Sequence, residues 1–162
     1  MAQNPDRQNK ETNMSTPEQN LWVRLEDAMR GYWIPQRIES GTNKGIPDVY
    51  FSIPQNSGWI ELKVIAKLPT RDTTPVKLPK FYSEQKLWIV KHGRITESVW
   101  ILIYVIASND YFLFPSHMAY DIDGALTGGE WMLHCSLYMR SRIDAGLLYN
   151  KLLEGCGSWT QS

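Results

Sequence analysis

The feature that most constrains the fold is the run SVWILIYVIA at residues 98–107, which is almost entirely apolar and rich in β-branched residues. A strand with one solvent-exposed face alternates polar and apolar residues. This run does not alternate, which indicates a central strand covered on both faces. Such a strand needs packed layers on each side of its sheet. The length of 162 residues, 43% of them hydrophobic, suits one domain with a core of its own. We therefore expect a layered fold built around a sheet.

Helices on either side of this run complete the pattern. The segment STPEQNLWVRLEDAMRG predicts a helix, with Thr16 as its N-cap, Pro17 in its first turn and Gly31 at its end. A second helix is predicted at residues 83–93 and a last one within residues 141–155. These helices are long enough to cover the faces of a sheet.

The remaining strands are short. Residues 47–53 and 59–66 predict an antiparallel hairpin joined by the five residues PQNSG, and residues 110–115 a further strand. Residues 35–40 suit a short strand or an approach loop, and the proline-rich residues 67–80 an unpacked surface loop. The order of elements predicts an α/β or α+β fold, with a mixed central sheet flanked by helices.

The ends and the composition narrow the class of protein. Residues 1–15 are polar without an apolar period, so we expect a disordered tail followed by one domain at residues 16–162. The first residues lack the apolar core of a signal peptide, and no segment is apolar enough to span a membrane. The two cysteines, Cys135 and Cys156, do not suit a disulfide scaffold or a zinc site. We expect a cytoplasmic protein.

Three charged residues occupy the predicted hairpin. Glu61 and Lys63 are two apart in one strand and so share a face, and Asp48 opens the preceding strand, where it can come opposite the Glu61 end. Two converging carboxylates repel each other unless a cation lies between them, and oxygen ligands suit Mg²⁺ or Mn²⁺. This pattern predicts a metal site held by Asp48, Glu61 and the backbone carbonyl of Leu62, with Lys63 beside it to orient a water or neutralise a phosphate. A solvated strand face is the alternative.

Two helical residues are candidates for the same site. Glu18 falls near the middle of the apolar stripe of the first helix, so its carboxylate needs a partner in the fold, such as the metal. Glu18 could equally complement the helix dipole. Glu26, at the edge of the stripe, is a weaker candidate than Glu18 for the acid that joins the site. Gln85 shares a helix face with Trp88 and could hold a phosphate or a metal-bound water, although a surface glutamine is the commoner case.

Basic residues adjoin these candidates. The whole chain has 17 Lys and Arg against 17 Asp and Glu, so attraction to nucleic acid must come from a local patch. From residue 63 to residue 94 there are eight basic residues and two acidic ones. Such a patch suits a phosphate backbone, and a solvated loop is the alternative. The candidate DNA contacts are Arg37, Lys44, Lys67, Arg71, Lys77, Lys80 and Lys86.

These residues resemble the motifs of the PD-(D/E)XK nuclease superfamily, and more narrowly its VRR-NUC and Holliday-junction-resolvase-like members, including small bacteriophage versions. The resemblance runs through Glu18, GIPD with Asp48, IELK with Glu61 and Lys63, and SEQKLW with Gln85, over roughly residues 17–114. Residues 115–162 match none of these motifs, and Val64 stands where many VRR-NUC members have glycine.

The resemblance implies a restriction-endonuclease-like fold and a Mg²⁺- or Mn²⁺-dependent DNA endonuclease. Asp48 and Glu61 would bind the metal, Lys63 would assist attack on the phosphate, and Glu18 and Gln85 would match the first-helix acid and the helix glutamine of these enzymes. It also implies a branched DNA substrate, a homodimer, and for a phage-encoded protein the cytoplasm of a bacterial host. Two alternatives stay open: a non-catalytic nucleic-acid-binding or virion-associated protein that keeps the fold, and an unrelated α+β protein with an accidental motif.

Overall fold

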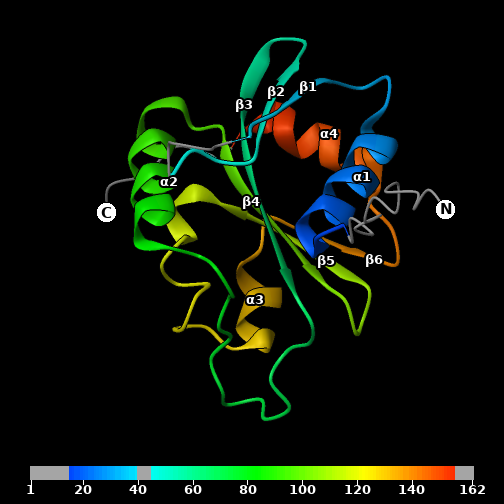
Figure 1. Cartoon of the computed structure of the whole chain (residues 1–162). Helices are drawn as coiled ribbons and strands as arrows, with labels where there is room; N and C mark the ends of the chain where they lie inside the picture. Colours follow the sequence, from blue (N-terminus) through cyan, green and yellow to red (C-terminus); the bar gives the residue numbers. More distant parts are fainter. Residues whose placement is uncertain (1–14, 40–44, 156–162) are drawn as a thin grey trace, which may run out of the picture.

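A six-stranded sheet forms the centre of the computed structural model, which describes residues 15–39 and 45–155 (Figure 1). Its strands lie in chain order, β1-β2-β3-β4-β5-β6, and all neighbours are antiparallel except β3 and β4, which are parallel. The strands are β1 (Ile34–Arg37), β2 (Val49–Ile53), β3 (Asn56–Ile65), β4 (Val99–Val105), β5 (Asp110–Pro115) and β6 (Leu137–Arg140). The mixed sheet is the one that the sequence predicts.

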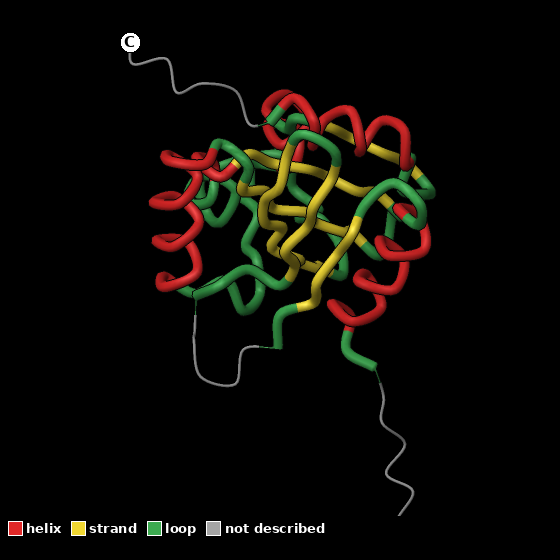
Figure 2. Tube along the Cα trace, turned by 90° about the horizontal axis from the view of Figure 1, so that it is seen from above, coloured by secondary structure: helices red, strands yellow, loops and turns green. Residues whose placement is uncertain are grey.

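Helices cover both faces of the sheet, as the view from above shows (Figure 2). α1 (Pro17–Met29) and α4 (Ala145–Glu154) pack on one face, over Ile60 and Leu62 of β3. α2 (Ser83–Thr96), the short 3-10 helix η1 (Ser116–Met118) and α3 (Gly128–His134) pack on the other, over Ile101 and Ile103 of β4. None of the helices within the described ranges is long and apolar enough to cross a lipid bilayer.

β4 lies near the middle of the sheet, and all seven of its residues are buried. This confirms the prediction that the apolar run forms a central strand covered on both faces. Because β3 and β4 are parallel, the chain must cross from the end of one to the start of the other, and α2 makes that crossover. The hairpin of β2 and β3 is also confirmed, but its connection is shorter than the sequence predicts. Register pairs Ile53 with Asn56, so only Pro54 and Gln55 form the turn.

The first helix begins as predicted. The Thr16 side chain accepts a hydrogen bond from the Gln19 backbone, and Pro17 occupies the first turn. The second helix corrects the prediction, since it continues past Gly93 to Thr96. A Cβ on Gly93 would lie 1.9 Å from the Ser116 Oγ, so this glycine allows η1 to approach the helix and does not end it. The glycine within α2 therefore marks the close approach of η1, and not the end of the helix.

Two further features depart from the sequence prediction. The loop at residues 67–80 has no regular structure, but it is packed, because Val76 and Leu78 are buried in the core on the α2 face. α3 and β6 were not predicted: α3 is a seven-residue helix and β6 a four-residue strand, too short to show a period. The predicted last helix is α4. The predicted tail, residues 1–15, lies outside the described residues except for Ser15.

Candidate active site

The site forms where β2 begins beside β3. Val49 is paired with Ile60, and two residues further the same register would set Pro47 against Leu62. The Asp48 side chain takes that place, as its Oδ2 accepts a hydrogen bond from the Leu62 backbone N–H at 2.8 Å. Since the N–H and C=O of a strand residue point toward the same neighbour, the Leu62 carbonyl also faces the Asp48 side. The Leu62 carbonyl therefore lies on the same side of β3 as the Asp48 carboxylate.

Glu61 and Lys63 lie side by side on the α2 face of β3. Their exposed fractions are 0% and 5%, so neither is the solvated strand residue of the alternative reading. Lys63 Nζ lies 2.8 Å from Glu61 Oε1. It also donates to the Lys80 backbone carbonyl at 2.9 Å and to Gln85 Oε1 at 3.3 Å, and the Phe81 ring lies 5.0 Å away. A buried ammonium group needs this number of partners.

Gln85 connects the two charges. Its Nε2 donates to Glu61 Oε1 at 2.7 Å, while its Oε1 accepts from Lys63 and from the backbone N–H of Tyr82 at 3.1 Å. Gln85 is in the first turn of α2, so the start of this helix is fixed against β3. The alternative of a free surface glutamine does not hold. Glu61, Lys63 and Gln85 form a closed triangle of contacts.

The electrostatics of the two carboxylates follow from their burial. Burial raises the pKa of Asp48 above its ordinary value, and the Leu62 N–H, Arg37 and Lys63 oppose the rise. Burial, and then the nearby charge of Asp48, raise the pKa of Glu61 to about 7, although Lys63 pulls it down. A cation bound between Asp48 and Glu61 would offset the repulsion between their carboxylates and favour the ionised form of both.

The donors at this point suit a hard cation. Glu61 Oε2 is buried and has no hydrogen-bond partner among the described residues, which leaves one carboxylate oxygen available. Together with Asp48 and the Leu62 carbonyl it offers oxygen ligands only, the set that Mg²⁺ accepts while retaining several waters. Among the described residues, no group of three or more His, Cys, Asp or Glu side chains converges closely enough to hold a metal. A cation here would depend on two carboxylates, a carbonyl and water.

Two side chains approach Asp48 from the side of α1. Glu18 is half-buried, and its charge adds to the raised pKa of Asp48, so it faces the site. Glu26, by contrast, is exposed. The charge of Arg37 lowers the pKa of Asp48, and its guanidinium lies 5.7 Å from the Trp22 ring. One Arg37 nitrogen, Nη1, is buried without a hydrogen-bond partner among the described residues. An oriented donor is thus left available beside the acids.

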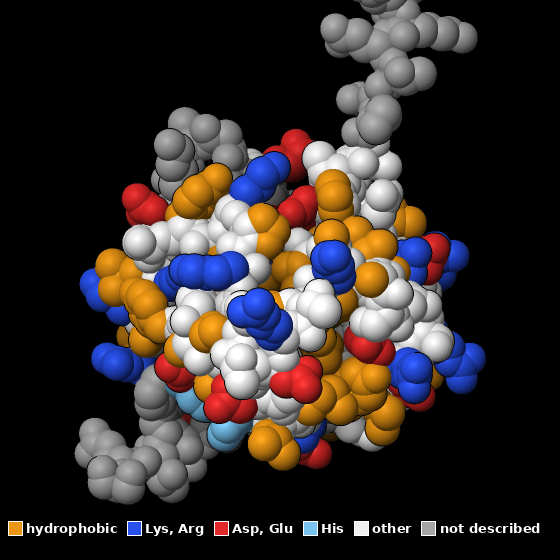
Figure 3. Space-filling model, turned by 90° about the horizontal axis from the view of Figure 1, so that it is seen from below, with side chains coloured by type: hydrophobic (Ala, Val, Ile, Leu, Met, Phe, Trp, Pro, Cys, Tyr) orange, Lys and Arg blue, Asp and Glu red, His pale blue; other side chains and the backbone are white. Residues whose placement is uncertain are grey.

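The other basic candidates are placed differently. Lys67, Arg71, Lys77 and Lys80 are exposed. Lys86 is paired with Asp123, with exposed fractions of 13% and 6% for the two side chains, and so it is not presented to solvent like the others. Lys44 lies outside the described residues. Seen from below, the molecule carries Lys and Arg side chains scattered among acidic, apolar and neutral ones, without a continuous stripe (Figure 3).

The packed loop reaches the site through its last residues. We call residues 74–81 the strap. Its Val76 carbonyl accepts from the Gly124 N–H at 2.7 Å and its Val76 N–H donates to Leu126 at 2.8 Å. Asp123 accepts from the Leu78 N–H at 2.8 Å as well as pairing with Lys86. These contacts hold the strap so that the Lys80 carbonyl meets Lys63.

Sequence reasoning missed this contact. Lys80 has a left-handed backbone, with φ of 54°, which an ordinary lysine seldom adopts. A carbonyl has no sequence signature, and Asp123 is 37 residues from Lys86. Only the flanking Pro79 indicated an irregular backbone here. Residues beyond 115, which match no motif, therefore take part in shaping the site.

Comparison with known proteins fits this geometry. No family model matches the chain, and a search of curated proteins gave no match. Among solved structures it is similar to Hjc of Archaeoglobus fulgidus, a Holliday junction resolvase from an archaeal hyperthermophile. The TM-score is 0.51 and the identity 17%, over 82% of this chain and 97% of Hjc. At that identity the likeness shows the fold alone, and it confirms the α+β class, with a mixed sheet between helices.

Proposed function

We propose that this chain is a divalent-metal-dependent endodeoxyribonuclease that hydrolyses phosphodiester bonds in branched DNA. The observation that carries the proposal is the group of Asp48, Glu61, Lys63 and Gln85, in which Glu61 and Lys63 are buried. One Glu61 oxygen has no hydrogen-bond partner in the part of the chain that the structure describes. The branched substrate rests on the fold shared with an archaeal Holliday junction resolvase. A homodimer would supply the two active sites that symmetric cutting of a junction requires.

The roles of the residues follow from their contacts. Asp48, Glu61 and the Leu62 carbonyl would hold Mg²⁺ or Mn²⁺, with Glu18 bound to the ion through a water. The ion, when bound, would polarise the phosphoryl oxygen and lower the pKa of a water. Lys63, held at this point by Gln85 and Lys80, would donate to the phosphate or to the attacking water. Arg37 Nη1, which has no hydrogen-bond partner within residues 15–39 and 45–155, would bind a phosphate oxygen near Asp48. Lys67, Arg71, Lys77 and Lys80 would contact DNA further from the cut.

The experiment is cleavage of a four-way DNA junction and a matched linear duplex, each with Mg²⁺, with Mn²⁺ and with chelator. We expect metal-dependent paired nicks in the junction. Asp48→Asn and Lys63→Ala should reduce cleavage at least about 100-fold while DNA binding is retained. Asp121→Asn is the matched control, because this carboxylate is exposed, and it should cut like the native chain.

Each result bears on a different part of the proposal. Equal cutting of the duplex would contradict the branched substrate but support the nuclease. Full activity in Asp48→Asn or Lys63→Ala would overturn the assigned site. Cutting that persists in chelator would overturn the metal dependence.

A second candidate is a non-catalytic DNA-binding protein that keeps the fold. It is favoured by the absence, in the described part of the chain, of a cluster of three or more metal-ligating side chains, and by the engagement of Lys63 with three protein oxygens. Thermal unfolding separates the two functions. A nuclease site should bind Mn²⁺ and raise the melting temperature of the native protein but not of Asp48→Asn. No shift with either metal, together with DNA binding, would favour the second candidate.

A further inference from the structure

The α2 side of β1, β2 and the start of β3 is partly open to solvent, and it begins one step from the acids. Register aligns the side chains in rows across the three strands. Continued one residue past Val49 and Ile60, it would set Asp48 opposite Glu61 in a first row. Tyr50 lies in the second row with Gln36 and Trp59, and Ser52 in the third with Ile34 and Ser57. Successive rows on one face are about 6.6 Å apart. We call the second and third rows the neutral shelf.

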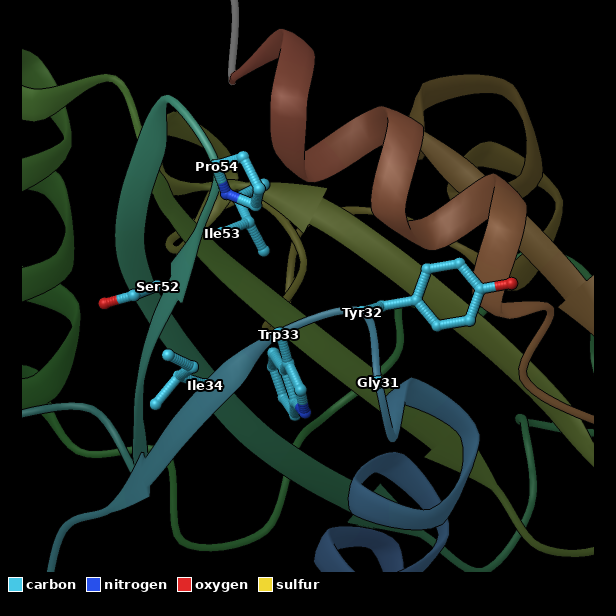
Figure 4. Close-up of a pocket in the computed structure, with 7 residues that line it drawn as sticks. All are labelled: Gly31, Tyr32, Trp33, Ile34, Ser52, Ile53 and Pro54. Atoms are coloured by element: carbon cyan, nitrogen blue, oxygen red, sulfur yellow. The ribbon is translucent and has the colours of Figure 1, made fainter.

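The shelf differs in chemistry from the site beside it. Its six side chains are Ile34, Gln36, Tyr50, Ser52, Ser57 and Trp59, and none of them carries a charge. Ile34 is 76% exposed, and Gln36 and Ser57 are exposed as well. Figure 4 shows the Ile34 and Ser52 side chains directed away from Tyr32, whose ring lies toward α4. These two residues also line a groove of about 410 Å³ at the edge of the sheet.

Aromatic rings continue the shelf toward α2. The Tyr50 and Trp59 rings lie 5.0 Å apart, and Trp59 meets the edge of Trp88 on α2 at 5.3 Å. Both contacts are tilted, at 60° and 73°, and all three residues remain partly exposed. Partly exposed rings of this kind can stack on a flat ligand, and the hydroxyl and amide groups of Ser52, Ser57 and Gln36 can donate and accept hydrogen bonds.

We propose that the neutral shelf binds unpaired nucleobases of the DNA substrate next to the phosphodiester that is cut. The inference rests on the proposed function and names the feature of branched DNA that the site selects. A phosphate backbone would need cations, which the shelf lacks, whereas bases bind by stacking and by hydrogen bonds at their edges. The shelf adjoins the row of Asp48 and Glu61, so a strand cut there would place its neighbouring bases on it.

Addition of a strand from a second protein chain is a poorer fit. The Ile38 N–H donates to the Asp48 carbonyl, so by alternation the N–H of residue 35 would point away from β2, to the open edge of β1. That residue is Pro35, which has no N–H to offer. The edge therefore discourages strand pairing while the shelf beside it stays open.

The test is a binding measurement in chelator, where no cleavage occurs. Fluorescence anisotropy of the full chain is recorded with a blunt DNA duplex and with the same duplex carrying a single-stranded tail. We expect the tailed DNA to bind more tightly, and Tyr50→Ala and Ile34→Glu each to weaken that binding about tenfold while blunt-duplex binding stays within twofold. Because Ile34 is exposed, its variant should fold. Tyr120→Ala, an exposed tyrosine outside the shelf and its groove, is the matched control.

The outcomes separate this inference from the proposed function. Equal binding of the two DNAs, or equal loss for both in the variants, would overturn the shelf as a base-binding site and leave the nuclease proposal standing. Failure of the native chain to bind either DNA would overturn both. A native dimer that Ile34→Glu converts to a monomer would make the shelf a contact between two copies of the chain and overturn the inference as well.

Discussion

Lys63 Nζ lies 2.8 Å from Glu61 Oε1, in a contact between two nearly inaccessible side chains two residues apart on one strand. Taking both charges out of water costs several kcal/mol, so a pair at this depth needs additional hydrogen bonds. Gln85 and the Lys80 carbonyl supply them to Lys63, and Gln85 supplies one to Glu61. The other Glu61 oxygen nevertheless has no partner among the residues that the structure describes. The site is therefore organised around a buried Glu61–Lys63 contact whose acid is still under-satisfied.

This under-satisfied acid predicts how stability depends on pH. The pKa of Glu61 is raised from 4.5 to about 7, so the folded state binds its proton more tightly than the unfolded state. That stabilisation is fully present below pH 4.5 and is lost as the pH rises through about 7. Urea unfolding of the native protein in chelator should show a fall on the order of 3 kcal/mol across this window. In Glu61→Gln most of the fall should vanish; an unchanged slope would mean that Glu61 titrates normally.

At Gly93, substitution by alanine should lower the stability of the fold, although helix propensity alone would raise it. Alanine in place of an exposed helical glycine stabilises by about 1 kcal/mol. A Cβ at Gly93, however, would lie 1.9 Å from the Ser116 Oγ and 2.4 Å from its Cβ. Gly93→Ala should therefore destabilise by about 2 kcal/mol or more, measured by urea unfolding. Combining it with Ser116→Gly, which removes both atoms, should recover most of the loss. Stabilisation by Gly93→Ala alone would contradict the close approach of α2 and η1.

Asp123 predicts a link between the strap and the active site. Asp123→Ala would leave the largely buried Lys86 without its ion-pair partner and the Leu78 N–H without an acceptor, so a loss of about 3 kcal/mol in the free energy of unfolding is expected. Lys86→Met with Asp123→Leu, which removes both charges, should regain part of it. Because the strap carries the Lys80 carbonyl to Lys63, kcat for DNA cleavage should fall more than KM rises in Asp123→Ala. Asp121→Asn is the control; an unaltered kcat would disconnect the strap from catalysis.

Much of the fold could be predicted from the sequence because its signals are local. The apolar run of β4, the N-cap at Thr16 and the alternation around Glu61 each depend on a few adjacent residues. The same locality predicted that Asp48 and Glu61 would meet, since a hairpin fixes the register of its strands. The errors lie where the decisive partner is distant in the chain. Gly93 is explained by Ser116, and the packing of the strap by residues 122–126.

The site divides in the same way. Gln85 lies in the first turn of α2, where this helix meets β3, and contacts Glu61 and Lys63. Its position three residues before Trp88, on the same helix face, was enough to propose it as a candidate from the sequence. The contact of Lys63 with the Lys80 carbonyl and the lack of a described partner for Arg37 Nη1 could not be predicted from the sequence. Both depend on which segments the tertiary structure brings together. Lys86 has the same charge as its exposed neighbours, and only the structure distinguishes it, by the Asp123 contact.

The two acids of α1 predict different responses to metal. Glu18 faces Asp48, whereas Glu26 is exposed and lies eight residues, about 12 Å, further along the helix. In thermal unfolding, Glu18→Gln should require roughly 10- to 100-fold more Mn²⁺ for the same rise in melting temperature, and Glu26→Gln should respond like the native chain. Without metal, Glu18→Gln should change stability little, because it removes repulsion from Asp48 while losing a favourable charge at the helix N-terminus. Equal Mn²⁺ responses in both variants would restrict the proposed ligands to Asp48, Glu61 and the Leu62 carbonyl.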